Sequence, residues 1–243
     1  AIERMTRAVA SIGVNGGSLE KDLLEKFGTA TPEAMVESAL RHLEMLEKEG
    51  FTNTKISLKA SDVIRTVQAY RLLAKQVDYP FHLGVTEAGT PFGGTIRSSL
   101  GMGILLAEGL GDTIRVSLTG DGEDECKVGH EMLRSLSLRE GGIRMVSCPS
   151  CGRVQIDLNR VAHEIEAGLK AINHEGITYA VMGCVVNGPG EAKDADLGVA
   201  GGAGEGLIYR KGELIRKVKE EDLVPAFLEE AQKYKLGMET AGG

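Results

Sequence analysis

The chain of 243 residues contains no tryptophan, and aromatic side chains make up only 4% of it. Single-stranded nucleic acid is commonly bound by stacking its bases on aromatic rings, so this composition disfavours such a surface. A continuous apolar run of about 18 residues is also missing, which argues against a transmembrane helix. Residues 1–5 show no basic and apolar signal pattern. We therefore expect no nucleic acid and no membrane among the partners.

Positive charge is in deficit, with 28 Lys and Arg against 35 Asp and Glu and a net charge of -7. This balance argues against a general nucleic-acid binder, although it leaves room for a local basic pocket. Cysteines number only four. Without a secretory signal, so few thiols suit a reducing cytosol and metal ligation better than disulfides. The apolar fraction of 42% fits a folded globular chain, so we expect a soluble cytoplasmic protein.

Short apolar runs alternate with amphipathic stretches in the first part of the chain. We expect strands at 11–15, 54–58, 81–85 and 113–118, and helices at about 19–27, 31–49, 62–76, 95–106 and 125–136. Ser18 is the expected N-cap of the first helix, and residues 89–94 are expected to form a glycine-rich loop. Repeated alternation of strand and helix predicts a parallel sheet with crossover helices.

A second α/β region follows a natural domain boundary near residues 139–142. Strands at 143–146 and 177–182 are expected to lead to Cys148 and Cys184, with a helix capped by Asp157 between them. Residues 207–209 and 213–216 are expected to form a hairpin, and residues 221–234 a final helix. We interpret the glycine-rich residues 201–206 as a flexible connector, because no helix and no Lys-Ser/Thr pair follow them.

Polar side chains stand where the four strands of the first part end. They are Asn15, Lys59, Thr86, Glu87, Arg115 and Ser117. Ligand sites in parallel α/β folds lie beyond the carboxyl ends of the strands, so we expect these side chains to share one mouth. Lysine and arginine together suit an anionic substrate such as a phosphate ester. A carboxylate in such a cationic mouth can act as general acid or base, which is the role we expect for Glu87.

Three of the four cysteines, Cys148, Cys151 and Cys184, lie beside glycine or proline at expected strand ends. A backbone of that kind folds closely around a compact ligand. Cys-x-x-Cys alone occurs in zinc sites, redox disulfides and iron–sulfur clusters, but a third thiol followed by Gly-Pro-Gly-Glu is more specific. We therefore predict a metal site, for which Glu191 is a candidate carboxylate ligand. Cys126 lies far from the others in sequence, and we expect it to be structural.

The residues leave the kind of metal site open. Zinc would take four protein ligands, which Cys148, Cys151, Cys184 and either His163 or Glu191 provide. A non-catalytic zinc-stabilised binding module is therefore one alternative. A cubane iron–sulfur cluster would have three thiolates and a weaker ligand such as Glu191, which substrate oxygen can displace, and this favours a catalytic cluster. A thioredoxin-like disulfide is a poorer fit because it leaves Cys184 without a role.

Several motifs together resemble one enzyme family over nearly the whole chain. They are Ile12-Gly13-Val14-Asn15, Gly17-Ser18-Leu19-Glu20, Lys59-Ala60-Ser61-Asp62, Thr86-Glu87-Ala88-Gly89, Arg115-Val116-Ser117-Leu118, Cys148-Pro149-Ser150-Cys151-Gly152-Arg153 and the stretch from Gly183 to Glu191. This set resembles the 4-hydroxy-3-methylbut-2-enyl diphosphate synthases of the methylerythritol phosphate route to isoprenoids. The string from Cys184 to Glu191 is its most specific part.

The resemblance implies an oxidoreductase that opens the ring of 2-C-methyl-D-erythritol 2,4-cyclodiphosphate with two electrons and loss of water. It implies a [4Fe-4S] cluster on Cys148, Cys151, Cys184 and Glu191, reduced by flavodoxin or ferredoxin. It also implies roles at matching positions of the first domain. Lys59, Arg115 and Ser117 would bind the diphosphate, and Asn15 and Thr86 would line the site. Glu87 would transfer a proton. Asn187 would approach the substrate from the cluster side. In the family the cluster domain of one subunit caps the barrel of another, which implies a homodimer.

The chain departs from the family pattern in two respects. The family has an eight-stranded barrel before the cluster domain, whereas only about four strand–helix units precede Gly141, and four strands do not close a barrel. We therefore expect the C-terminal half of a TIM-type (β/α)8 barrel in residues 1–141 and a small α/β iron–sulfur domain in residues 142–243. An inactive fragment of the synthase is the alternative. Ser11 stands where we expect the family to carry an arginine, so the resemblance does not supply that diphosphate contact in this chain.

Overall fold

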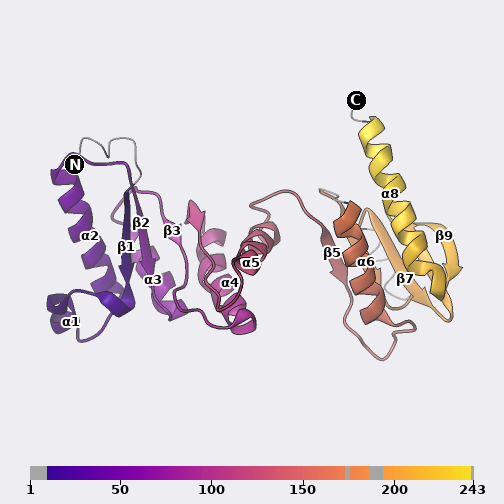
Figure 1. Ribbon diagram of the computed structural model, residues 1–243, viewed down its shortest axis with the longest axis horizontal. Coiled ribbons are helices and arrows are strands. Elements are labelled where there is room, and N and C mark those ends of the chain that lie inside the picture. Colours follow the sequence, from indigo (N-terminus) through magenta and orange to yellow (C-terminus); the bar gives the residue numbers. More distant parts are fainter. Residues whose placement is uncertain (1–9, 173–175, 186–193, 242–243) are drawn as a thin grey trace. The chain divides into compact units, whose positions relative to one another are not determined.

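The computed structural model describes residues 10–172, 176–185 and 194–241 of the chain. Its helices and strands form two compact units that divide between Arg139 and Glu140 (Figure 1). Among the described residues, no helix is both long enough and apolar enough to cross a membrane.

The first unit alternates strands and helices. Its elements are β1 (Ala10–Asn15), the 3-10 turn η2 (Gly16–Ser18), α1 (Lys21–Phe27), α2 (Pro32–Lys48), β2 (Thr54–Lys59), α3 (Val63–Leu73), β3 (His82–Leu83), α4 (Pro91–Ala107), β4 (Thr113–Ile114) and α5 (Gly122–Ser135). β1 pairs with β2 and β3 with β4, both in parallel, and a parallel bridge from Ile56 to Phe81 joins β2 to β3. The strands are therefore successive parallel neighbours, which confirms the predicted α/β class.

Two helices begin where their capping residues predict. The Thr31 side chain accepts a hydrogen bond of 3.2 Å from the amide three residues ahead, and Pro32 opens α2. Asp62 caps α3 in the same way, with a bond of 2.6 Å. The prediction that Ser18 caps α1 was wrong. The chain after β1 first makes the η2 turn, which contains Ser18, and α1 begins only at Lys21.

The strands β3 and β4 are shorter than predicted, with two residues each. The predicted ranges continue beyond them without regular ladder pairing, although the Arg115 amide still donates to the Leu83 carbonyl at 2.9 Å. The glycine-rich loop predicted for residues 89–94 is also shorter, because α4 already begins at Pro91. Proline at the first helical position outweighs the low helix propensity of the two glycines that follow it.

Alternation of side chains gives β1 and β2 an apolar face and a polar face. Ile12 and Val14 of β1, and Ile56 and Leu58 of β2, are buried in the core that also contains residues of α2 and α3. The residues between them belong to the opposite face, which carries the polar side chains of the strand ends. The hydrophobic core thus lies on the helix side of the strands and leaves the other side for function.

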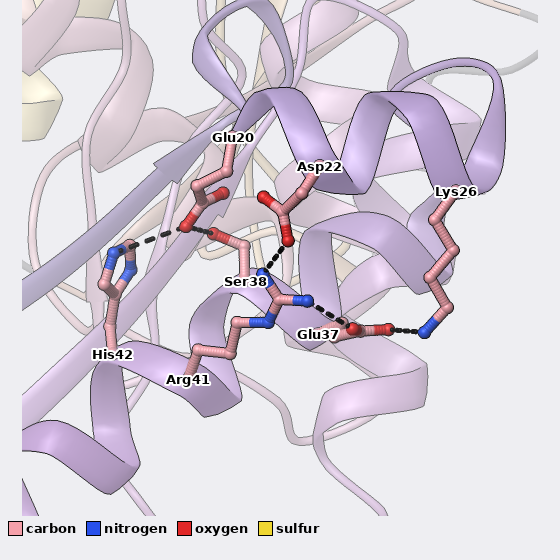
Figure 2. Close-up of polar contacts among 7 residues, drawn as sticks. All are labelled: Glu20, Asp22, Lys26, Glu37, Ser38, Arg41 and His42. Carbon is pink, nitrogen blue, oxygen red and sulfur yellow. Dashed lines mark hydrogen bonds and ion pairs between the residues drawn. The ribbon is translucent and has the colours of Figure 1, made fainter.

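Polar contacts join the short helix α1 to α2. Figure 2 shows the residues concerned, which are Glu20, Asp22, Lys26, Glu37, Ser38, Arg41 and His42. The Arg41 guanidinium bridges Asp22 of α1, at 2.5 Å, and Glu37 of its own helix, at 2.8 Å. Lys26 of α1 reaches the same Glu37 at 2.7 Å. Because these groups are largely exposed, they fix the orientation of α1 more than they stabilise the unit.

Tyr70 of α3 links β2 to β3 from the core side. Its side chain is fully buried, and its hydroxyl accepts a hydrogen bond from the Leu58 amide at 3.0 Å and donates one to the His82 carbonyl at 2.6 Å. One phenol thus satisfies a donor on one strand and an acceptor on the next. It holds together the two strands between which regular ladder pairing is sparse.

We expect Tyr70→Phe to lower the free energy of unfolding by about 1–3 kcal/mol, because both backbone groups lose a buried partner. Urea unfolding of the chain, followed by circular dichroism, measures this change. Tyr79→Phe is the matched control: its hydroxyl also makes a hydrogen bond, to Glu47 at 2.8 Å, but in an exposed position. The control is expected to stay within about 0.5 kcal/mol of the original chain. Equal stability of the two variants would refute the bridging role of Tyr70.

The second unit is a five-stranded mixed sheet with its long helices on one face. Its elements are β5 (Arg144–Ser147), α6 (Leu158–Ile172), β6 (Thr178–Met182), β7 (Leu197–Gly202), β8 (Glu205–Arg210), β9 (Glu213–Lys219), the 3-10 turn η3 (Glu220–Asp222) and α8 (Leu223–Ala241). The strands lie in sequence order, with parallel pairs from β5 to β7 and antiparallel pairs from β7 to β9. Figure 1 shows α6 and α8 side by side, and both contribute to one core with the sheet.

The interpretation of residues 201–206 as a flexible connector was wrong. Gly201 and Gly202 are buried in β7, and Gly206 is buried in β8, where it pairs with Gly201. A Cβ on Gly201 would lie 2.7 Å from a side-chain carbon of Ile156, and one on Gly206 would lie 2.5 Å from Leu223. These glycines therefore allow close packing over the strands, a tertiary requirement that the local sequence does not reveal.

Candidate functional site

Four residues at the strand ends of the first unit lie in one row across neighbouring strands. Asn15 of β1 pairs with Lys59 of β2 in the parallel register. Counting from the Ile56–Phe81 bridge places Lys59 beside Gly84, and Arg115 follows on the next strand. The row thus brings together the amide, the ammonium and the guanidinium that the sequence placed at separate strand ends. Asn15 and Arg115 are exposed, whereas Lys59 is only 6% exposed.

Gly84 gives Lys59 room to cross toward β4. A Cβ on this residue would lie 3.0 Å from Cε of Lys59 and 2.9 Å from the carbonyl oxygen of Arg115. Burial lowers the pKa of the Lys59 ammonium to about 8, with further contributions from Arg115 and Lys55. The buried Lys59 ammonium and the Arg115 guanidinium repel one another, and a bound anion would relieve that repulsion. The row is therefore suited to an anionic ligand.

Thr86 and Ser117 extend the polar surface one step beyond the row. The Ser117 hydroxyl accepts a hydrogen bond from Nε of Arg115 at 3.2 Å, which orients the guanidinium. The Thr86 amide donates to the Ala60 carbonyl, the residue after Lys59, at 3.3 Å. The first bond lies within one strand end, and the second joins the ends of two neighbouring strands, so Thr86 and Ser117 lie at the same edge as the row.

Glu87 is exposed and has a left-handed backbone conformation, with φ 53°. For a residue other than glycine this conformation costs on the order of 1–3 kcal/mol and persists only where the surroundings enforce it. The strained turn places Glu87 directly after Thr86, at the carboxyl edge of the strands. Its position is compatible with the acid or base role predicted from the sequence.

His82 lies on the same polar face as Gly84, two residues earlier, although the sequence predicts no role for it in the site. Its Nδ1 lies 2.8 Å from Oγ1 of Thr113 on the neighbouring strand. Burial, together with Lys59, Lys55 and Arg115, lowers the pKa of the imidazole to about 4. His82 is therefore neutral at physiological pH and adds no third charge beneath the cation row. Period-two alternation within 82–86 was the signal for its placement.

We expect Lys59→Met to raise the free energy of unfolding of the unliganded chain by on the order of 1–3 kcal/mol at neutral pH. The folded state must desolvate the ammonium beside Arg115, whereas the unfolded state does not. Since the pKa is about 8 when folded and ordinarily 10.5, both states hold the proton below pH 8. The gain is therefore complete below pH 8 and shrinks as the pH rises from 8 toward 10.5.

Urea unfolding near pH 7 and near pH 10 measures this dependence. Lys48→Met is the control, because this exposed lysine only pairs with Glu44 within α2. It is expected to change stability by less than about 0.5 kcal/mol at both pH values. A loss of stability in Lys59→Met at neutral pH would show that the buried ammonium is not destabilising.

The second unit places Cys148 and Cys184 just after two parallel neighbours, β5 and β6. The Gly183 amide donates a hydrogen bond to Sγ of Cys148 at 3.2 Å, and the Gly183 carbonyl accepts one from Gln155 at 2.9 Å. Gly183 thus joins the loop of the first two cysteines to the strand end that carries the third. A Cβ at this position would lie 2.9 Å from Val154, so only glycine fits. Cys184 is 5% exposed.

Cys151 is exposed, and hydrogen bonds from the backbone and side chain of Arg153 hold the pKa of its thiol below the usual value. The thiolate is the form that binds metals, and three soft sulfur donors suit iron or zinc. No three His, Cys, Asp or Glu side chains within residues 10–172, 176–185 and 194–241 are gathered as a metal site. The predicted Asn187 and Glu191 lie outside the described residues. The three thiols have the donor chemistry that a sulfur-ligated metal group needs, but the described residues do not gather them around one point.

Two family models match the chain. One, described as the GcpE TIM-barrel domain, matches residues 2–130, and the other, the GcpE protein C-terminal domain, matches residues 144–233. Together they cover most of the chain, and they bear out the prediction of a TIM-type barrel portion followed by a second domain.

Curated relatives agree with these matches. Proteins of Geobacter sulfurreducens, Maridesulfovibrio salexigens and Clostridium perfringens are 62%, 59% and 59% identical over 91%, 92% and 88% of this chain. Each is named 4-hydroxy-3-methylbut-2-en-1-yl diphosphate synthase (flavodoxin). The matched regions make up 63%, 62% and 61% of those proteins. The chain thus spans somewhat less than two thirds of the length of the relatives it matches.

Proposed function

Because the chain belongs to the GcpE family, we propose that the complete protein is a 4-hydroxy-3-methylbut-2-enyl diphosphate synthase. The substrate is 2-C-methyl-D-erythritol 2,4-cyclodiphosphate. Its ring opens with uptake of two electrons and two protons and loss of one water, which gives 4-hydroxy-3-methylbut-2-enyl diphosphate in the methylerythritol phosphate pathway. The observation that carries the proposal is the buried Lys59 ammonium beside Arg115 at the ends of parallel strands.

The described polar face accounts for binding of the cyclic diphosphate. Lys59 and Arg115 neutralise its charge, and the guanidinium offers paired donors to phosphate oxygens. Ser117 orients that guanidinium through the bond of 3.2 Å and offers its own hydroxyl. Asn15 and Thr86 line the site with an amide and a hydroxyl. Because Lys59 is buried and Arg115 acts on it electrostatically, this ammonium stabilises an anion more strongly than an exposed lysine would.

Glu87 is the proposed proton donor or acceptor. Its carboxylate stands on a strained turn next to Thr86, outside the cation row but at the same edge. A carboxylate held at that edge can move a proton at the bound substrate. Asn187 is proposed to contact the substrate from the side of the metal group.

We assign the metal group as a [4Fe-4S] cluster bound by Cys148, Cys151, Cys184 and Glu191. When bound, the cluster supplies the electrons for the ring opening. The Gly183 amide, which donates to Cys148, is the kind of N–H group that stabilises a cluster sulfur. The relatives' names support flavodoxin as electron donor, and ferredoxin is the other candidate. We further propose a cytoplasmic homodimer.

Anaerobic reconstitution of the complete protein with iron and sulfide, followed by assay with the cyclodiphosphate and reduced flavodoxin, tests the proposal. We expect about four irons and four sulfides per chain, and reductant-dependent formation of the linear diphosphate. A single tightly held zinc and no turnover would instead favour the binding-module alternative. Iron–sulfur content without turnover would contradict the proposed reaction while leaving the ligand assignment standing.

A further inference from the structure

The turn that carries Glu87 has an unusual backbone that no strand pairing supports. Glu87 has φ 53° and Gly89 has φ 106°, so two of three successive residues are in the left-handed region. Ala88 between them is 1% exposed. Because β3 already ends at Leu83, regular ladder pairing does not reach Glu87, and the last cross-strand bond before it joins the Thr86 amide to the Ala60 carbonyl. Other contacts must therefore hold the conformation in which the carboxylate stands.

Arg97 of α4 makes a side-chain contact of this kind. Its Nη1 donates a hydrogen bond of 2.6 Å to the carbonyl oxygen of Ala88. A Cβ on Gly89 would lie 3.0 Å from the same nitrogen, so the guanidinium packs directly on the turn where glycine leaves room. The acceptor is a backbone carbonyl rather than a carboxylate. The bond therefore fixes the main chain instead of neutralising a charge.

Two backbone contacts complete the attachment of the turn. The Gly89 carbonyl accepts a hydrogen bond from Thr119 at 2.9 Å, and the Thr90 carbonyl accepts one from Gly94 at 2.7 Å. Gly94 itself packs so closely that a Cβ would lie 2.9 Å from the Gly89 carbonyl oxygen. Of these three hydrogen bonds only the one from Arg97 is made by a side chain. It is therefore the one that a substitution can remove.

We propose that Arg97 is a positioning residue: its bond to the Ala88 carbonyl holds Glu87 in the strained conformation that the proton transfer requires. This inference rests on the proposed function, because it assigns Arg97 to that reaction. Arg97 acts through the backbone of the turn and not through contact with the substrate. Its loss should consequently lower the rate of the chemical step while substrate binding by the cation row persists.

The test compares Arg97→Met and Arg97→Lys with the original complete, cluster-loaded protein. Arg97→Met keeps the apolar stem and removes the donor, and we expect kcat to fall by about tenfold to a hundredfold with KM changed much less. Arg97→Lys keeps one donor and should recover part of that loss. In Arg97→Ala, added methylguanidinium should restore part of kcat, which a general loss of structure would not allow.

Arg71→Met is the matched control. Arg71 forms a two-bond ion pair with Glu108 that joins α3 to the end of α4, away from the turn. Removing its guanidinium breaks a contact with Glu108 at the end of α4 and leaves the contacts of residues 86–90 in place. We expect its kcat to match that of the original protein. Equal losses in Arg71→Met and Arg97→Met, an unchanged kcat in Arg97→Met, or no response of Arg97→Ala to methylguanidinium would each overturn the proposal.

Amide hydrogen exchange separates this inference from the proposed function. In Arg97→Met, exchange should accelerate at Thr119, whose amide donates to Gly89, while the amides of Leu58, which donates to Tyr70, and Arg115, which donates to Leu83, stay protected. Arg71→Met should leave the Thr119 amide unaffected. If the original protein does not convert the cyclodiphosphate, the proposed function fails whatever the exchange pattern. If it does, and Thr119 exchanges equally in all variants, the positioning role of Arg97 fails alone.

Discussion

Cys184→Ser is expected to reduce bound iron in the reconstituted complete protein from about four atoms per chain to less than about one, and to abolish turnover. Cys184 is the most buried of the three thiols and directly follows Gly183, which contacts Cys148. A serine hydroxyl is a harder and far less acidic donor, and in a buried position it would have to ionise to bind iron. Iron and sulfide analysis, together with visible absorbance, measures the change.

Cys126→Ser is the control for this experiment, since Cys126 is an exposed residue of α5 in the other unit. It should retain the metal content and activity of the original protein. Equal cluster content in Cys184→Ser and Cys126→Ser would remove Cys184 from the ligand set. Zinc retained in all variants would show that the site is not an iron–sulfur site.

Glu87→Gln should lower kcat by about a hundredfold to ten thousandfold while iron content and substrate affinity stay close to those of the original protein. The amide has nearly the same shape as the carboxylate but transfers no proton at this pH. The strained turn, with φ 53°, is available to glutamine as readily as to glutamate, so the backbone should not change. Steady-state kinetics and iron analysis separate loss of proton transfer from loss of the cluster.

Glu123→Gln makes the same chemical change on the exposed first turn of α5, where Glu123 pairs with Lys127. Its kcat should stay within about twofold of the original protein. A Glu87→Gln variant with undiminished turnover would exclude proton transfer by Glu87. A variant that binds substrate poorly at normal kcat would assign Glu87 to binding instead.

The parts of the fold that local rules determine could be predicted from the sequence. Thr31 and Asp62 cap their helices, and the strand of Lys59 ends where its apolar run ends, because caps and periodicity act over a few residues. The strand β7 was not predicted. Ile156 requires glycine at position 201 of β7, and Leu223 requires it at position 206 of β8. Both partners are distant in sequence, and glycine is ordinarily a signal of a loop.

The candidate site also has a part that could be predicted from the sequence and a part that could not. The strand-end positions of Asn15, Lys59 and Arg115 follow from the apolar runs before them, so their shared edge was predictable. The path of the Lys59 side chain across Gly84 was not predictable. It depends on which strand lies beside β2 and on the absence of a side chain at position 84. The contact from Arg97 to Ala88 was not predictable either, because it depends on where α4 lies relative to the turn. A single arginine in a helical sequence does not indicate which group its side chain will contact.

The hydrogen bonds around Gly183 bear on the order of maturation. Cys148 and Cys184 are positioned by pairing of β5 with β6 and by a core that includes Val161 and Phe227, none of which involves metal. Zinc fingers, by contrast, fold only when metal binds. We therefore expect the apoprotein to be a folded acceptor that iron and sulfide enter late. Oxidative loss of the cluster would then leave a chain ready for reloading rather than one that must refold.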